Sequence, residues 1–202
     1  MYATDALRSE HRVIEQVLSC LEKIADQCAV EGTLDTHSAR QAIDFFQTFA
    51  DRCHHGKEEG RLFPLLEMRG VLREHGPVGV MLYEHDQGRQ HIRAMVDALD
   101  GADRGEPRSL SQFVDHARAY GRLLRDHIWK EDNRLFPMAE QVLTDQDRQG
   151  LENSFERLEA SEMGLGTHEK YLDLAHELCG RLGVPCASSE VAVHACGHCR
   201  HN

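Results

Sequence analysis

Two copies of one helical motif constrain the fold of this chain more than any other feature of its sequence. His54 and His127 are each followed four residues later by a glutamate, Glu58 or Glu131, and then by Arg-Leu-Phe-Pro. Because residues four apart lie on one face of a helix, each copy directs an imidazole and a carboxylate to the same point. The proline that closes each motif lacks a backbone N–H group, so the helix is expected to end or kink shortly after the two side chains.

The duplication extends to a second histidine in each half of the chain. His11 precedes His54 by 43 residues, His85 precedes His127 by 42, and both earlier histidines directly follow a glutamate. Apolar residues flank these positions at the alternating spacing of three and four that marks the buried face of a bundle helix. The sequence therefore predicts two helical hairpins that form an all-α, up-down-up-down four-helix bundle over residues 1–142.

The rest of the chain lies outside the duplication. A weaker helical pattern over residues 145–182, interrupted at residues 164–166, predicts an additional C-terminal helix within residues 143–183 that packs on the bundle or forms a dimer contact. Residues 184–202 form a tail rich in Cys and His. Its Cys186, Cys196 and Cys199 are candidates for a second site that binds zinc or is redox-active, although one Cys-x-x-Cys pair is a weak signal and a flexible tail is the alternative.

Composition argues against several classes of function. The chain of 202 residues carries a formal charge of −11, which disfavours nucleic acid or an anionic membrane surface as a partner. No apolar stretch approaches the roughly 20 residues that span a bilayer, and the first residues do not have the pattern of a signal peptide. We expect a cytoplasmic protein, monomeric or homodimeric, whose seven Cys are reduced thiols or metal ligands.

The residues that face the core predict a buried metal centre. Each bundle helix contributes one inward His, and two helices also contribute an inward Glu. A single inward His is usually a hydrogen-bonded core residue, but four of them beside two carboxylates are different, because an ionised Glu without a partner is very costly to bury. The predicted ligands are His11, His54, Glu58, His85, His127 and Glu131.

The ligand count favours two metal ions. If both carboxylates bridge, each ion receives two imidazole nitrogens and two carboxylate oxygens, and an oxo or hydroxo bridge supplies a fifth ligand. An octahedral ion then keeps one position open for a small molecule. The mixture of imidazole and carboxylate suits iron, with manganese or zinc as competitors.

Further residues are expected close to the ions. His55 and Glu59 repeat the spacing of the first motif one residue later, rotated by about 100° around the helix. We expect this pair to be solvated or to support the ligands, and the alternative is that His55 reaches an iron as an extra ligand. Glu10 and Glu84 are expected to orient ligands or to replace them. Tyr120 lies two turns before the second motif on the inward face and is expected to cover the site.

Together these residues resemble the hemerythrin-like (HHE cation-binding) family over roughly residues 5–140. The resemblance rests on the two Glu-His pairs and on both motifs that end in Leu-Phe-Pro. It implies a non-haem di-iron site on the predicted ligands, with Glu58 and Glu131 as bridges. Two positions depart from the oxygen carriers of the family. Arg89 stands where they have a fifth His in the third helix, and the bridging acid of the fourth helix is Glu131 instead of an Asp one residue further on.

These departures make reversible oxygen carriage a poor expectation for the chain. The resemblance instead implies a protein that binds and redox-activates dioxygen, hydrogen peroxide or nitric oxide at a bridged di-iron centre. A di-iron peroxidase or a nitric-oxide-reducing enzyme would need an electron donor as partner. The alternatives are a non-enzymatic iron or oxygen sensor, an iron donor for the repair of iron centres, and a plain oxygen binder.

Overall fold

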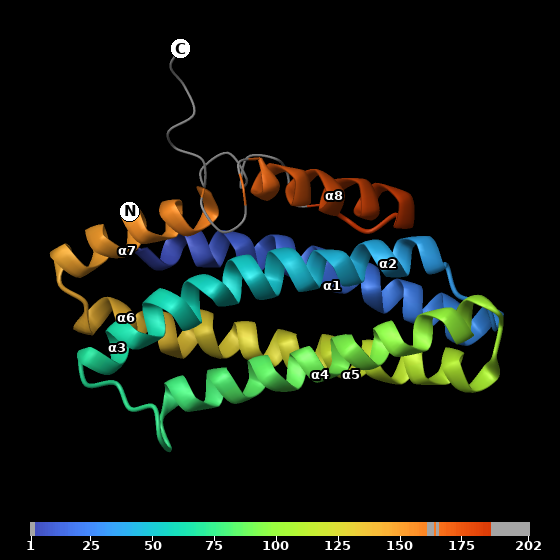
Figure 1. Ribbon diagram of the computed structural model, residues 1–202, viewed down its shortest axis with the longest axis horizontal. Helices are drawn as coiled ribbons and strands as arrows, with labels where there is room; N and C mark the ends of the chain where they lie inside the picture. Colours follow the sequence, from blue (N-terminus) through green and yellow to red (C-terminus); the bar gives the residue numbers. More distant parts are fainter. Residues whose placement is uncertain (1–2, 161–163, 165, 187–202) are drawn as a thin grey trace, which may run out of the picture.

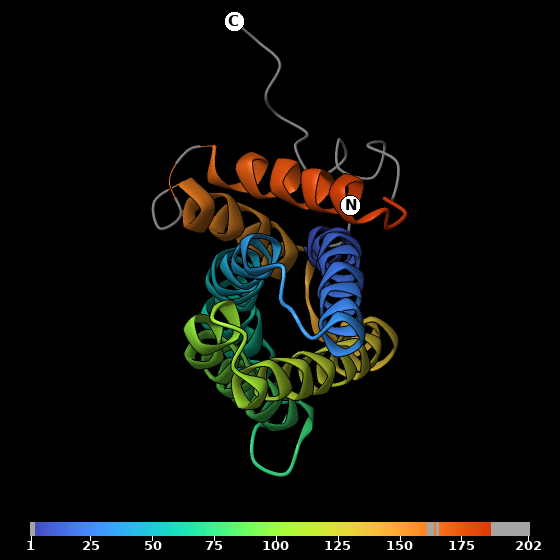
Figure 2. The same ribbon diagram turned by 90° about the vertical axis from the view of Figure 1, so that its right-hand side faces the viewer.

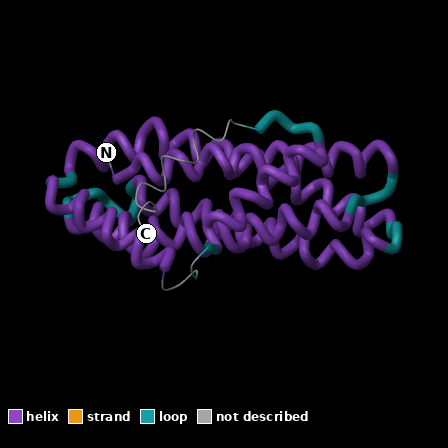
Figure 3. Tube along the Cα trace, turned by 90° about the horizontal axis from the view of Figure 1, so that it is seen from above, coloured by secondary structure: helices purple, strands orange, loops and turns teal. Residues whose placement is uncertain are grey.

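The chain is helical throughout the part that the structure describes. A computed structural model describes residues 3–160, 164 and 166–186, and these residues contain helices and connections but no strand (Figure 3). None of the described helices has both the length and the apolar character that a membrane-spanning segment requires.

Long helical stretches, each interrupted at most by a change of helix type, build the body of the molecule (Figure 1). The first is α1 alone, the second runs from α2 through the π-helical segments η1 and η2 into α3, the third is α4, and the fourth runs from α5 through η3 into α6. Their bounds are α1 Ala3–Glu31, α2 Thr36–Phe45, η1 Phe46–His55, η2 Glu58–Leu62, α3 Phe63–Met68, α4 Pro77–Asp103, α5 Pro107–Lys130, η3 Glu131–Leu135 and α6 Phe136–Val142.

These stretches pack in a closed ring. Helix α1 contacts α2 and α5, and α4 contacts the same two helices from the opposite side. The end-on view shows the four stretches around one common interior (Figure 2). The prediction of an all-α helical bundle is therefore confirmed.

The two Leu-Phe-Pro sequences do not end their helices. The π-helical segments η2 and η3 finish at Leu62 and Leu135, and Pro64 and Pro137 then lie in the first turn of α3 and α6. The first turn of a helix tolerates proline because its N–H groups have no partner within the helix. The helices were expected to end or kink shortly after the ligands, and each stretch runs past its proline before it ends at Met68 or Val142. What precedes each proline is a stretch with i→i+5 hydrogen bonds, which insert an extra residue into the turn.

Two helices, and not one, follow the bundle within the described residues. Helix α7 (Asp145–Leu158) and helix α8 (Thr167–Leu182) are separated by a break in which Gly164 and Gly166 have φ angles of 86° and 80°. The sequence predicted one helical pattern interrupted at residues 164–166, and the structure has a separate helix on each side of that interruption, because these left-handed conformations suit glycine and cannot continue a right-handed helix. Helix α7 packs on α1 and η2, and α8 packs on α1 and α2 (Figure 1). Cys196 and Cys199 lie outside the described residues, and the domain limits at residues 142 and 183 stay predictions.

A polar layer separates two apolar clusters of the core. Along α1, Leu7 belongs to one cluster and Ile14 to the other, and the buried pair Glu10 and His11 lies between them. The other bundle helices repeat this order. The layer contains Glu10, His11, His54, His55, Lys57, Glu58, His85, His127 and Glu131, all buried.

Candidate metal centre

Five buried imidazoles in the polar layer share one arrangement. Each Nδ1 lies within hydrogen-bonding distance of a carboxylate, which orients the ring and turns its Nε2 into the layer. The pairs are His11 with Asp132 at 2.8 Å, His54 with Glu10 at 2.9 Å, His55 with Asp51 at 3.2 Å, His85 with Glu59 at 2.7 Å and His127 with Glu84 at 2.9 Å.

Four of these Nε2 atoms face one another in two close pairs. His11 Nε2 lies 3.0 Å from His54 Nε2, and His85 Nε2 lies 3.0 Å from His127 Nε2. Two imidazole nitrogens at this distance repel each other unless a proton or a metal cation lies between them. The geometry therefore defines two positions that favour a cation.

Glu58 and Glu131 lie between these two positions. Both side chains are 0% exposed, and none of their oxygens has a hydrogen-bond partner within the described part of the chain. Glu131 Oε2 lies 3.2 Å from His11 Nε2 and 3.3 Å from His127 Nε2. Glu58 Oε2 lies 3.7 Å from His54 Nε2 and 3.5 Å from His85 Nε2. Each carboxylate thus reaches one imidazole of both pairs, as a bridging ligand would.

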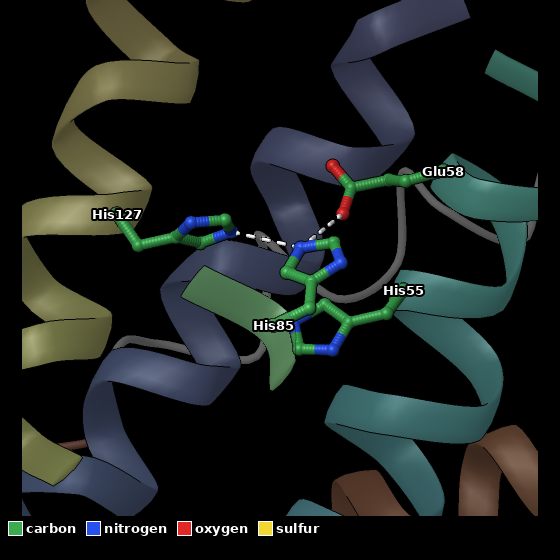
Figure 4. A group of neighbouring side chains, drawn as sticks. All are labelled: His55, Glu58, His85 and His127. Carbon is green, nitrogen blue, oxygen red and sulfur yellow. Dashed lines mark hydrogen bonds and ion pairs between the residues drawn. The ribbon is translucent and has the colours of Figure 1, made fainter. Parts of the chain in front are cut away.

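His55 adds a fifth imidazole to the donors. Its ring stacks on that of His85 with centroids 3.7 Å apart, and its donor atom lies close to those of Glu58, His85 and His127 (Figure 4). A role of His55 in supporting the ligands, or as an extra ligand, stays a prediction, but the expectation of solvation does not hold for this buried side chain. That expectation assumed α-helical geometry, whereas His55 ends the π-helical segment η1, in which each residue turns less far around the axis, so that His54 and His55 both face inward.

Arg89 supports this side of the centre without contributing a donor to it. Its guanidinium donates to Asp51 Oδ1 at 2.9 Å and to Glu59 Oε1 at 2.7 Å, and these carboxylates hold His55 and His85. Burial and the hydrogen bond from His55 act in opposite directions on Asp51, and together with Arg89 they lower its pKa to about 2. The centre therefore has an imidazole from His55 and a supporting cation from Arg89.

The electrostatics of the layer favour a cation. Burial lowers the pKa of His127, but Glu131 and Glu84 outweigh it and raise that pKa to about 9. Burial and the charge of Glu131 raise the pKa of Glu58 well above its ordinary value. Five imidazole nitrogens and two carboxylates fit two first-row transition-metal ions, and this mixture of donors suits iron.

The supporting residues follow the duplication of the sequence. Glu10 and Glu84 orient His54 and His127, and Glu59 and Asp132 orient His85 and His11. Sequence reasoning missed the roles of Asp51 and Asp132. Asp51 lies four residues before His55, and Asp132 directly follows Glu131 as Glu59 follows Glu58, so spacing and symmetry were signals that could have identified both.

Lys57 and Lys130 are the points at which the two halves differ most. Each ammonium donates to the glutamate of its own half, Glu10 or Glu84. The side chain of Lys130 is 36% exposed, whereas that of Lys57 is 1% exposed, because helix α7 covers it and Glu159 accepts a second hydrogen bond from it. Helix α7 therefore encloses Lys57. Because Lys57 contacts Glu10, and Glu10 holds His54, this C-terminal helix completes the surroundings of His54.

A cavity of about 170 Å³ opens beside the three-imidazole side of the centre. His55, His85 and His127 line its inner end, and Tyr120 forms part of its wall. Gly88 leaves the space open, since a Cβ there would lie 3.3 Å from the Tyr120 ring. Of the predicted tail site, only Cys186 lies within the described residues, and it is distant in sequence from every donor of the centre.

Several known proteins and one protein family are similar to this chain. The uncharacterized protein Rv1995 of Mycobacterium tuberculosis (strain H37Rv) is 21% identical to the chain over 182 residues, which are 90% of this chain and 71% of the relative. The iron-sulfur cluster repair protein YtfE of Dickeya chrysanthemi is 30% identical over 95 residues, 43% of this chain and 40% of the relative. No solved structure matches the chain significantly. Residues 2–139 match the family described as hemerythrin HHE cation binding domain. With more than half of its residues in that match and the donor set in its core, the chain belongs to the hemerythrin HHE cation-binding family.

Proposed function

We propose that the chain binds two iron ions in its polar layer and that a small ligand meets them there. His55, His85 and His127 would hold one ion, His11 and His54 the other, and Glu58 and Glu131 would contact both. The observation that carries this proposal is the pair of 3.0 Å contacts between Nε2 atoms beside two buried carboxylates without hydrogen-bond partners among the described residues. Bound iron would supply Lewis acidity and one-electron redox steps.

The cavity supports the choice of ligand. A volume of about 170 Å³ accommodates dioxygen, hydrogen peroxide or nitric oxide, since one water occupies about 30 Å³ of the liquid. Arg89 and Arg93 line the cavity together with Asp51 and Glu84, and Arg89 is paired with Asp51 at 2.7 Å, so these charges largely balance and suit a small neutral or polar molecule. Phe46, Ile92 and Leu124 add apolar side chains to the lining.

A second candidate is donation of iron to damaged iron centres. The similarity over 95 residues to a protein named for iron-sulfur cluster repair favours it. In this case the polar layer would store iron that leaves the protein, and turnover of a small ligand would not be needed.

Metal analysis and ligand titration test the first proposal. Protein purified with and without air is expected to contain about two iron ions per chain, given the donor set. Reduced protein is expected to change its optical spectrum with nitric oxide or peroxide. One equivalent of zinc with little iron would overturn the proposal.

The cavity is tested separately with Gly88→Val, which places methyl groups against Tyr120. We expect unchanged iron content and slower spectral change on addition of nitric oxide. Gly150→Val on α7 is the matched control, because a Cβ there meets no atom within 4 Å. An unchanged rate in Gly88→Val would remove the cavity from the proposal. The repair function would be favoured if iron moves rapidly to an added chelator and the optical spectrum does not respond to nitric oxide or peroxide.

A further inference from the structure

A pair of cysteines outside the metal centre joins two segments that are far apart in the sequence. Cys20 lies in α1 and Cys179 in α8, both are fully buried, and their sulfur atoms are 3.6 Å apart. No sequence motif connects them. The contact exists because α8 packs along α1, and it lies within the larger apolar cluster.

A third thiol extends this pair toward the surface. Cys186 is partly exposed and packs against the same apolar cluster, near enough to Cys179 for each thiol to affect the pKa of the other. The end of α8 makes this possible, because Gly183 has a φ angle of 61° and the Val184 N–H donates to the Cys179 carbonyl at 2.9 Å. This is the helix ending that turns the chain back over its last turn. Cys186, Cys179 and Cys20 thus form a row from a half-buried position into the core.

The thiols of the row differ in acidity. The hydrogen bond from Cys179 lowers the pKa of Cys20, and the charge of Lys23 acts in the same direction. Burial and the hydrogen bond with Cys179 raise the pKa of Cys186 to about 11. A thiolate is the attacking species in disulfide exchange, so Cys20 is the best nucleophile of the three.

We propose that Cys186, Cys179 and Cys20 form a thiol relay that a hydroperoxide oxidises to a disulfide between α1 and α8. Cys186 is the partly exposed thiol of the three, and its thiolate, which the raised pKa makes scarce near pH 7 and more abundant at alkaline pH, attacks the O–O bond, becomes a sulfenic acid and releases water. Cys179 sulfur then displaces the hydroxyl as a second water, which gives a Cys179–Cys186 disulfide. Cys20 thiolate attacks the Cys179 sulfur and expels the Cys186 thiolate. In total, two thiols lose two electrons and two protons, and one hydrogen peroxide becomes two waters.

The disulfide would join helix α8 to the bundle. Helix α8 otherwise rests on α1 and α2 through noncovalent packing. A cross-link between Cys20 and Cys179 closes a long loop and restricts the unfolded chain, so the oxidised protein should melt at a higher temperature. The relay does not depend on the metal centre, and its test is independent of iron content.

Peptide mapping of the intact, purified protein tests the relay. The reduced protein is treated with one equivalent of hydrogen peroxide, or with oxidised glutathione, which does not need iron to react. Free thiols are then alkylated, and the digest is analysed by mass spectrometry. We expect a peptide that links Cys20 to Cys179 with both oxidants. Cys28, which is also buried in α1 but has no described thiol beside it, should be alkylated in full and serves as the internal control.

Two variants assign the roles within the row. Cys20→Ser should trap the link between Cys179 and Cys186, and Cys186→Ser should slow the formation of the link between Cys20 and Cys179 at least tenfold. Cys28→Ser should behave as the unmodified chain. The relay is refuted if Cys20 and Cys179 stay alkylatable after Cys186 is oxidised, or if Cys186 links only to cysteines near the C-terminus.

Discussion

Replacing Glu58 with Gln should make the metal-free protein more stable and the iron-loaded protein less stable. Glu58 and Glu131 are both 0% exposed, and neither has a hydrogen-bond partner among the described residues. Without a metal ion, the folded protein must keep Glu58 charged beside Glu131 or protonate it. Gln has the size of a protonated Glu and a similar number of polar atoms, so Glu58→Gln isolates the free-energy cost of the charge.

The size of the stability difference is set by whichever state of Glu58, charged or protonated, costs less free energy in the folded protein. The ordinary pKa of Glu58 is 4.5, and burial with the nearby Glu131 raises it well above that value. Holding the proton at pH 7 costs at most about 3 kcal/mol, at roughly 1.4 kcal/mol for each pH unit. Metal-free Glu58→Gln should therefore be up to about 3 kcal/mol more stable, or about 6–12 °C higher in Tm for a chain of this length.

The pH dependence has a defined sign. A carboxyl group whose pKa is raised in the folded state binds a proton there while the unfolded chain has released it, so stability falls as pH rises above 4.5. The advantage of Glu58→Gln over the unmodified chain should shrink as the pH is lowered from 7 to about 4.5. With iron bound, the unmodified chain should be the more stable of the two. A free iron concentration of 1,000 times the Kd stabilises the folded state by about 4 kcal/mol, and the variant should gain less because it lacks one bridging carboxylate.

Thermal and urea denaturation of metal-free and iron-loaded protein measure these differences, with metal content determined for every sample. Glu156→Gln on α7 is the matched control, since this exposed Glu should change stability by less than about 0.5 kcal/mol. The reasoning is refuted if metal-free Glu58→Gln is less stable than the unmodified chain, or if both show the same dependence on pH.

Two further perturbations test the arrangement around the centre. His55→Ala should lower the iron content per chain, because one ion loses an imidazole, whereas His91→Ala, outside the donor set, should retain all of it in the same elemental analysis. Lys57→Met should cost about 3–5 kcal/mol in urea denaturation, because it leaves Glu10 buried without its cation, and Glu10→Gln in the same chain should restore most of this loss. Lys130→Met, at the equivalent but half-exposed position, should cost about 1 kcal/mol or less, and equal losses at the two lysines would contradict the role assigned to α7.

Much of the fold and of the donor set was accessible from the sequence because both follow from spacing along helices. The repeat of His, Glu and Leu-Phe-Pro identified four donors, and the Glu-His pairs upstream identified two more. The structure brings all six of these side chains into one buried layer. It also shows the expected symmetry in the hydrogen bonds of Glu10 with His54 and of Glu84 with His127.

The sequence was a poor guide wherever the helices depart from α geometry. An angle of about 100° per residue placed His55 off the inward face, yet η1 is π-helical and turns His54 and His55 inward together. The same change of helix type precedes Pro64 and Pro137, and both helical stretches continue past these prolines. Backbone hydrogen bonds decide between these helix types, and the pattern of apolar residues does not distinguish them.

By itself, the sequence determined the helical bundle, its internal duplication and the donors that face its core, because helical periodicity is a local property of consecutive residues. Only the tertiary structure decided that α7 covers Lys57, that Arg89 holds the partners of His55 and His85, and that α8 brings Cys179 to Cys20. These contacts join segments from about 30 to about 160 residues apart, and their positions depend on how whole helices pack, which no spacing within one helix encodes.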